Sequence, residues 1–263
     1  MTAKWIIDEM ESWAPTTWAE KWDNVGLLIG DISQKINKVL VALDATDDVI
    51  NEAIEGNYNC IITHHPLLFT PVKRITSEDT TGRKILKLIK HNICLYAAHT
   101  NLDAAPDGVN DVLAEKLDIK NIRPMIPDAL NPAIGAGRIG TLENEITLAE
   151  LIEHVKTALN LKEARYTSDL NKKIKKVAIC GGSGMGYWHG AVDCDVYITG
   201  DVKYSDALKA LETGLSIVDI THYSGEAIII EAIVNRLRKK AKHNKISLEI
   251  NPTSVNGQTL FTL

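Results

Sequence analysis

Two adjacent histidines, His64 and His65, follow the apolar run CIIT. Neighbouring side chains on a strand point to opposite faces, so at a strand end the two imidazoles can diverge and each can serve a different metal ion. The pair therefore indicates a metal site. Four other histidines have the more ordinary contexts of surface or core residues: His91, His154, His189 and His243.

A second pattern occurs twice, once in each half of the chain. An apolar run leads into a histidine, and a carboxylate follows four residues later: His99 with Asp103, and His222 with Glu226. Functional groups of α/β sheets gather beyond the carboxyl ends of strands. We therefore expect these side chains to join the histidine pair in a site.

Imidazole nitrogens combined with carboxylate oxygens suit Zn, Fe, Mn, Co or Ni, whereas Ca²⁺ prefers more oxygen ligands and Mg²⁺ keeps more waters. If three of these histidines and the two carboxylates are the ligands, they cannot fill two coordination shells, which leaves positions for water and substrate. A carboxylate such as Glu226 can bridge two ions roughly 3.5–4 Å apart and so help to activate water. The chemistry would be attack on a carbonyl, a phosphoryl group or an electron-poor ring carbon.

Two further motifs have a functional and a structural interpretation. The glycine-rich segment 180–186 follows a predicted strand, and its backbone N–H groups can hold a phosphate. It lacks the P-loop and GxGxxG signatures. A tight turn therefore explains the glycines equally well. Asp201 can line a pocket with Lys203 and Tyr204, or cap the helix predicted over 202–214. Its position favours the cap.

The elements that would position these residues alternate between strand and helix. The first half begins with a helix over 4–13, and Thr46 or Asp47 is expected to begin the helix that ends at Gly56. The order that follows is strand, helix, strand, helix, strand and a final helix, over 38–46, 47–57, 60–66, 82–92, 93–103 and 108–119.

Part of this order returns after residue 173. The segments 174–182, 191–201 and 214–226 echo 36–44, 56–65 and 91–103 in the same sequence. We expect a duplicated α/β fold with two related domains, largely parallel sheets and a metal site at strand carboxyl ends. The Pro- and Gly-rich segment 123–140 is expected to be the connection. The predicted domains are 1–125, with 222–263 packing back onto it, and 126–221.

Composition narrows the class of protein. The chain has 263 residues, of which 45% are hydrophobic, and a net charge of -5, so a globally basic surface for nucleic acid or an anionic membrane is excluded. Four scattered cysteines form no CxxC pair and are expected to be buried, reduced thiols. No signal peptide and no stretch of ~20 apolar residues is present, which predicts a cytoplasmic protein.

Five segments together give the chain a family resemblance: WDNVGLLIGD (22–31), THHPLLF (63–69), HTNLDAAPDGVND (99–111), GDVKYSDALKALETG (200–214) and THYSGE (221–226). They resemble the NIF-three-like dinuclear-metal proteins, often described as GTP cyclohydrolase I type 2 homologues. The resemblance implies two divalent metal ions per chain and a toroidal homohexamer, a trimer of dimers. Its metal ligands fall on His64, His65, Asp103, His222 and Glu226.

The same resemblance places His99 beside the site, where it would orient a ligand or a water. Many relatives have a histidine at the position of Ser205, which leaves the role of that segment open. The implied activity is conversion of GTP to dihydroneopterin triphosphate, with no catalytic residue identified. The alternatives are a metal-dependent hydrolase of a phosphoester or cyclic amide, and a non-enzymatic metal-binding or regulatory interaction protein.

Overall fold

The strands form two separate sheets in the computed structural model, which describes residues 1–261. The chain divides into two units. The first contains Met1–Leu102 and Ile229–Gly257, and the second contains Asp103–Ile228 and the described residues after Gly257. Within residues 1–261 no helix is both long and apolar enough to cross a membrane.

The sheet of the first unit has the order β1-β4-β3-β2-β11. Only β1 runs antiparallel to its neighbour. Thr63 at the end of β3 pairs with Ala42 on one side and Ala97 on the other, so three parallel strands end at the same level. The strands are β1 (Gly26–Ile29), β2 (Lys38–Ala42), β3 (Cys60–Thr63), β4 (Cys94–Ala97) and β11 (Glu249–Pro252).

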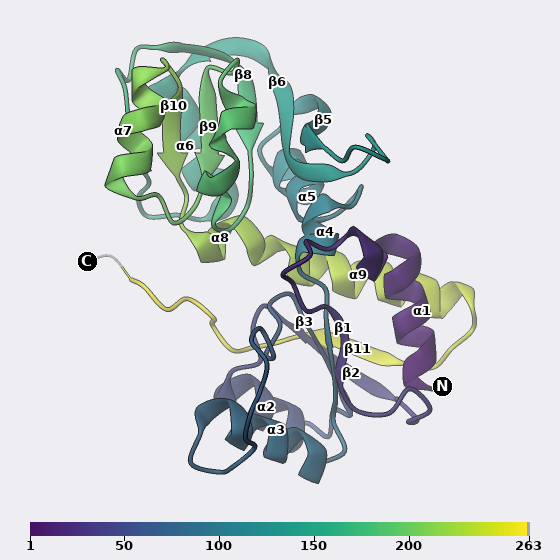
Figure 1. Cartoon of the computed structure of the whole chain (residues 1–263). Helices are drawn as coiled ribbons and strands as arrows, with labels where there is room; N and C mark the ends of the chain where they lie inside the picture. Colours follow the sequence, from purple (N-terminus) through teal and green to yellow (C-terminus); the bar gives the residue numbers. More distant parts are fainter. Residues whose placement is uncertain (262–263) are drawn as a thin grey trace. The chain divides into compact units, whose positions relative to one another are not determined.

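The helices of this unit cover both faces of the sheet. Apolar residues of α2 (Asp47–Glu55) and α3 (Thr80–Lys90) pack against β2, β3 and β4, and Figure 1 shows these two helices together on one side, with α1 (Ala3–Trp13) and α9 (Ile228–His243) on the other. Thr46 caps α2 by accepting a hydrogen bond from the Val49 N–H, and Gly56 ends it, as predicted.

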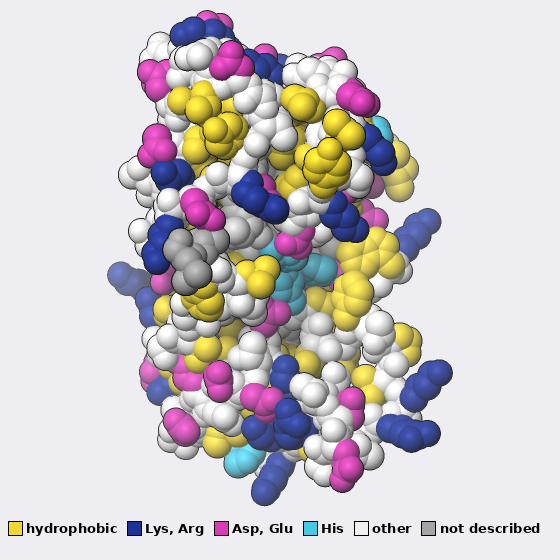
Figure 2. All heavy atoms as spheres, turned by 90° about the vertical axis from the view of Figure 1, so that its left-hand side faces the viewer, with side chains coloured by type: hydrophobic (Ala, Val, Ile, Leu, Met, Phe, Trp, Pro, Cys, Tyr) yellow, Lys and Arg dark blue, Asp and Glu magenta, His cyan; other side chains and the backbone are white. Residues whose placement is uncertain are grey.

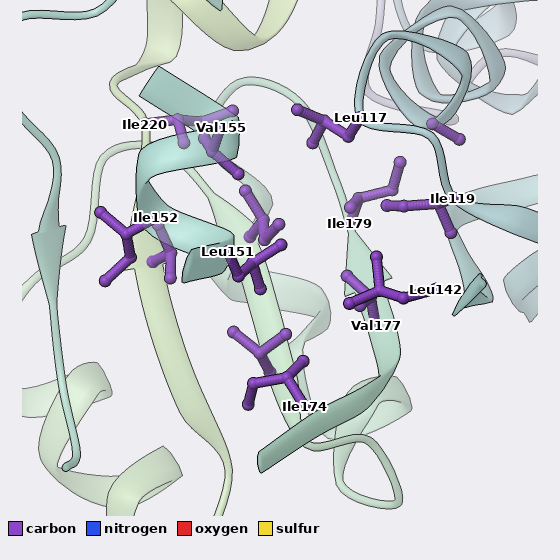
Figure 3. Close-up of a cluster of buried hydrophobic side chains, with 14 of the residues drawn as sticks. Leu117, Ile119, Leu142, Leu151, Ile152, Val155, Ile174, Val177, Ile179 and Ile220 are labelled. Carbon is purple, nitrogen blue, oxygen red and sulfur yellow. The ribbon is translucent and has the colours of Figure 1, made fainter. Parts of the chain in front are cut away.

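The second unit has a six-stranded sheet in the order β5-β6-β8-β9-β10-β7. Side chains of β8 alternate between two cores. Val177 and Ile179 join α5 and α6 on one face (Figure 3), and Ala178 joins η2 and α7 on the other. The strands are β5 (Lys120–Pro127), β6 (Gly135–Thr147), β7 (Arg165–Tyr166), β8 (Lys173–Ile179), β9 (Val196–Thr199) and β10 (Ser216–Asp219). The helices are α5 (Val109–Lys116), α6 (Leu148–Leu159), η2 (Gly184–Ala191), α7 (Tyr204–Glu212) and α8 (His222–Glu226).

Two expectations were wrong here. Residues 123–140 are not a connection between domains, because they form most of the antiparallel β5–β6 hairpin. Pro124 and Pro127 fit in β5 because it is an edge strand, where a missing N–H is tolerated. The pairing in the second sheet is mixed, since β5–β6, β6–β8 and β7–β10 are antiparallel; the mainly parallel prediction holds for the first sheet only.

The strand-and-helix order expected for each half is present in each unit. The parallel strands of the first unit follow as β2-α2-β3-α3-β4, and those of the second as β8-η2-β9-α7-β10. The second unit has a 3₁₀ helix where the first has α2. Common origin of the two units by duplication stays a prediction.

Candidate metal centre

Three histidines of the first unit lie together at the carboxyl ends of β3 and β4. His64 and His65 directly follow β3, and His99 lies two residues after β4. One ring nitrogen from each lies within 4.8 Å of the others. The ring centroids are 5.1–5.5 Å apart. The register of the parallel strands therefore brings together imidazole rings that are far apart in the chain, such as His65 and His99, which are separated by 34 positions.

Each of these rings is held through Nδ1 by an oxygen acceptor. His64 Nδ1 lies 2.7 Å from the carbonyl oxygen of Ala98. His65 Nδ1 lies 2.9 Å from Oδ1 of Asp44. A carbonyl oxygen only accepts, and a carboxylate accepts in its ionised form, so both rings carry their proton on Nδ1. Their Nε2 lone pairs are consequently oriented for coordination, the arrangement typical of metal-ligating histidines.

His99 has the same arrangement with a more deeply buried partner. Its Nδ1 lies 2.9 Å from Oδ1 of Asp23, whose side chain is fully buried. Burial alone would raise the pKa of Asp23, but hydrogen bonds from His99 and Thr100 and the charge of His99 outweigh it and lower the pKa to about 2. Asp23 is therefore ionised at neutral pH and fixes the His99 ring.

In the second unit, one turn of α8 carries a histidine and a carboxylate on the same side. His222 Nε2 lies 3.0 Å from Oε2 of Glu226, and its Nδ1 lies 2.7 Å from Oδ2 of Asp201. Residues four apart face each other on a helix. Thr221 sets the start of α8, because its hydroxyl accepts from the Ser224 N–H. Glu226 is buried, at 4% exposed.

The backbone of the glycine-rich loop passes against this carboxylate. A Cβ on Gly182 would lie 1.8 Å from Oε1 of Glu226, and the residue has φ +64°. Gly181 donates its N–H to Oδ1 of Asn110. The loop therefore requires glycine for close approach to Glu226, and the Gly181 N–H already has a protein acceptor.

Asp103 lies near the end of α4 (Thr100–Ala104), and its backbone is fixed by buried polar groups. Asn110, 1% exposed, donates to the Asp103 carbonyl, and Arg138 donates to the carbonyls of Ala104 and Ala105. Burial, followed by the negative charges of Asp103 and Glu226, raises the pKa of the Cys180 thiol to about 12. The carboxylates of Asp103 and Glu226 therefore both lie near the buried thiol of Cys180.

Each unit thus groups part of the predicted ligand set. The first groups His64 and His65 with His99, and the second holds Asp103, His222 and Glu226. Figure 2 shows one face of the molecule, on which several histidine side chains, coloured cyan, reach the surface. That the five residues bind the same pair of ions stays a prediction.

The expected helix cap at Asp201 was wrong. Lys203 is the N-cap residue of α7, with no side-chain cap, while Asp201 has φ +52° and accepts from His222. Asp23 and Asp44 were missed by sequence reasoning. Asp44 follows β2 directly after Leu43, so the rule that located the histidines at strand ends could have found it.

The remaining histidines and the cysteines have the structural contexts expected of them. His154 lies 3.6 Å from an Asp118 oxygen, and His189 stacks on Trp188 at 4.2 Å between centroids. No candidate metal group among residues 1–261 includes them, His91 or His243. All four cysteines are buried and form no disulfide.

Comparison with known proteins gives consistent matches over the whole chain. Residues 1–258 match the model of the Duf34/NIF3 (NGG1p interacting factor 3) family. A Clostridium perfringens protein named GTP cyclohydrolase 1 type 2 homolog is 40% identical, over 89% of this chain and 90% of its own. A Bacillus cereus protein related to NIF3 has a TM-score of 0.95 at 28% identity, covering 100% of this chain and 99% of its own. The Staphylococcus aureus hypothetical protein SA1388 has a TM-score of 0.94 at 35% identity, with the same coverage.

Proposed function

Because the chain belongs to the Duf34/NIF3 family, we propose that it is a metal-dependent hydrolase that holds two divalent ions per chain. The metal identity is one of Zn, Fe, Mn, Co or Ni, which nitrogen and carboxylate donors suit. The proposed ligands are the five residues that the sequence motifs single out: His64, His65, Asp103, His222 and Glu226.

One observation carries the metal proposal. Each of the three ligand histidines has an oxygen acceptor at Nδ1, provided by Ala98, Asp44 and Asp201. A histidine that only fills a core needs no such uniform orientation, whereas a metal ligand needs Nε2 deprotonated and aimed. The two buried or half-buried carboxylates supply negative charge that bound cations would neutralise.

The chemistry follows from the donor set and from His99. Two bound ions would polarise a substrate oxygen and lower the pKa of a water molecule. His99 is outside the proposed ligand set, yet its ring lies 5.2 Å from that of His64 and its Nδ1–H is held by Asp23. His99 is therefore the candidate for proton transfer at Nε2.

The first substrate to test is GTP. Two relatives named GTP cyclohydrolase 1 type 2 homolog are each 40% identical over most of the chain. The reaction would hydrolyse the five-membered part of the GTP purine ring at the carbon between its two nitrogens and release that carbon as formate. Rearrangement of the ribose and ring closure would then give dihydroneopterin triphosphate, with one water consumed overall. The family description, which names an interacting factor, favours a second candidate, a metal-binding interaction protein without turnover.

The experiment measures metal content and turnover on the same samples. Protein loaded with Zn, Mn or Fe is expected to hold about two ions per chain and to produce a fluorescent pterin from GTP. His64→Ala and Glu226→Ala are expected to lose metal and activity, whereas His154→Ala serves as the matched control. Two ions per chain with no product from GTP, phosphodiesters or cyclic amides would reject the hydrolase and favour the interaction protein.

We also propose that the protein assembles as a homohexamer, as its family resemblance implies. Sedimentation velocity at micromolar concentration is expected to give six times the chain mass of 28.9 kDa. A species of one or two chains at that concentration would contradict this proposal without affecting the metal ligands.

A further inference from the structure

Two large aromatic side chains lie half exposed beside the histidines of the first unit. Trp22 is 55% exposed and Phe69 is 50% exposed. Their ring centroids are 5.7 Å apart, and they lie 6.1 Å and 6.4 Å from the centroid of His99. The two rings and the His99 imidazole thus form one cluster, which we call the aromatic corner.

The aromatic corner is held in place rather than left on loose loops. Asn24 donates from Nδ2 to the Leu68 carbonyl, 2.6 Å away, and so joins the residues after Trp22 to the residue before Phe69. Asp23, next to Trp22, is buried and accepts from His99 and Thr100. Hydrogen bonds therefore hold the chain directly after Trp22 and directly before Phe69.

Exposure of these rings is not what core packing predicts. The chain contains only two phenylalanines and five tryptophans. The core cluster between the sheet and helices α2 and α3 is nearly all aliphatic, while Phe69 remains outside the buried core. Two half-exposed aromatic rings in contact with each other form a surface that suits the binding of another ring.

We propose that the aromatic corner binds the planar heteroaromatic ring of the substrate, the chemical class to which nucleobases and pterins belong. This inference rests on the proposed function, because it supplies the ring-binding part of the same site. The planes of Trp22 and Phe69 are inclined at 58°. A planar ring can therefore stack on the face of one and meet the other edge to face, the two arrangements that aromatic rings prefer.

The position of the corner suits a reacting ring. A ligand ring stacked on Trp22 at about 3.5–4 Å would remain next to His99, whose imidazole is nearly perpendicular to the indole at 74°. The ligand ring would then lie beside the His99 imidazole. A protein partner is a poorer fit, since a stable interface needs on the order of 1,000 Å² and the corner has two exposed rings.

The test compares ligands with and without a ring on metal-loaded protein by isothermal titration calorimetry. The ring-bearing probes are GTP, ATP and pterin, and tripolyphosphate is the anion without a ring. Trp22→Ala is expected to raise the Kd for GTP about tenfold, Phe69→Ala is expected to raise it less, and Trp22→Phe is expected to retain most of the affinity. Metal content and the Kd for tripolyphosphate are expected to stay unchanged.

Ile75→Ala is the matched control, because Ile75 is 51% exposed in the same connection between β3 and α3 but has no ring. An unchanged Kd for GTP in both Trp22→Ala and Phe69→Ala would overturn the inference, as would failure of the wild type to bind any ring-bearing probe. Ring-dependent binding of GTP without product would sustain the aromatic corner and reject GTP as the substrate of the hydrolase. Product formation with the same KM for GTP in the wild type and in both variants would support the hydrolase and overturn the aromatic corner.

Discussion

His222 donates from Nδ1 to the carboxylate of Asp201, 2.7 Å away. This contact fixes which ring nitrogen carries the proton and turns Nε2 toward Glu226, 3.0 Å away. Asp201 thereby acts on a proposed metal ligand without being one. Asp44 does the same for His65 in the first unit.

Replacement of Asp201 should therefore weaken metal binding. We expect Asp201→Ala to lower the affinity for Zn²⁺ about 10–100-fold, because the His222 ring loses its fixed tautomer and orientation. Asp201→Asn should lose less, since the amide oxygen still accepts. Chelator competition measures the Kd. Asp206→Ala is the control, an acid on α7 whose ion-pair partner, Lys209, is 3.9 Å away; equal affinity in Asp201→Ala and this control would contradict the prediction.

Gly182 is predicted to tolerate no side chain. A Cβ there would meet Oε1 of Glu226 at 1.8 Å, and φ of +64° disfavours residues other than glycine. Gly182→Ala should push Glu226 away and reduce the metal count per chain, measured by elemental analysis. Gly186→Ala is the matched substitution in the same glycine-rich segment, 180–186, because a Cβ there meets nothing within 4 Å. Full metal occupancy in Gly182→Ala would show that Glu226 moves without consequence or is not a ligand.

The sequence allowed the strand ends to be predicted because their signals are local. The β2, β3 and β4 strands are short buried runs, and the capping threonine and terminal glycine of α2 are each visible in sequence. The hairpin of β5 and β6 was missed because prolines and glycines usually mark loops. Whether a proline is tolerated depends on its strand lying at the edge of a sheet, which only the order of strands reveals.

The same limit applies to the residues of the candidate metal centre. Histidines after strands could be recognised, because a ligand type and a strand end coincide in the sequence. Asp23 and Asp201 could not be assigned as the partners that orient His99 and His222, since they lie 76 and 21 positions away in the sequence. A helix cap and an acceptor for a histidine look alike in sequence. Only the fold distinguishes them.

Asn110 is predicted to link two parts of the second unit. It is 1% exposed, donates to the Asp103 carbonyl at 3.0 Å and accepts from the Gly181 N–H at 3.0 Å. Asn110→Asp keeps the acceptor and removes the donor. We expect a loss of about 1–3 kcal/mol in the free energy of unfolding, because a buried polar contact is broken, and weaker metal binding through Asp103.

The matched variant for that substitution is Asn121→Asp, which removes an exposed amide donor to Thr141. Urea unfolding and chelator titration of both variants provide the comparison. If the two variants were equally stable and bound metal equally well, Asn110 would have no positioning role.

Glu52 ties the residues after β11 to α2 in the first unit. Its carboxylate accepts hydrogen bonds from the Thr253 hydroxyl and from the N–H and hydroxyl of Ser254, the latter two at 2.8 Å and 2.7 Å. Burial alone would raise the pKa of Glu52, but these hydrogen bonds outweigh it and lower the pKa below its usual value.

A carboxyl whose pKa is lower in the folded state stabilises the fold fully above its unfolded pKa, and this contribution disappears as pH falls through the folded pKa. Glu52→Gln should therefore lower the Tm at pH 7 by about 2–4 °C, the effect of about 1 kcal/mol. The difference from wild type should shrink as pH falls below about 4.5. Differential scanning calorimetry of metal-free protein across this range measures it. Glu55→Gln, an exposed carboxylate on the same helix, should change Tm little at either pH, and a Tm difference for Glu52→Gln that is constant with pH would show that its ionisation is not involved.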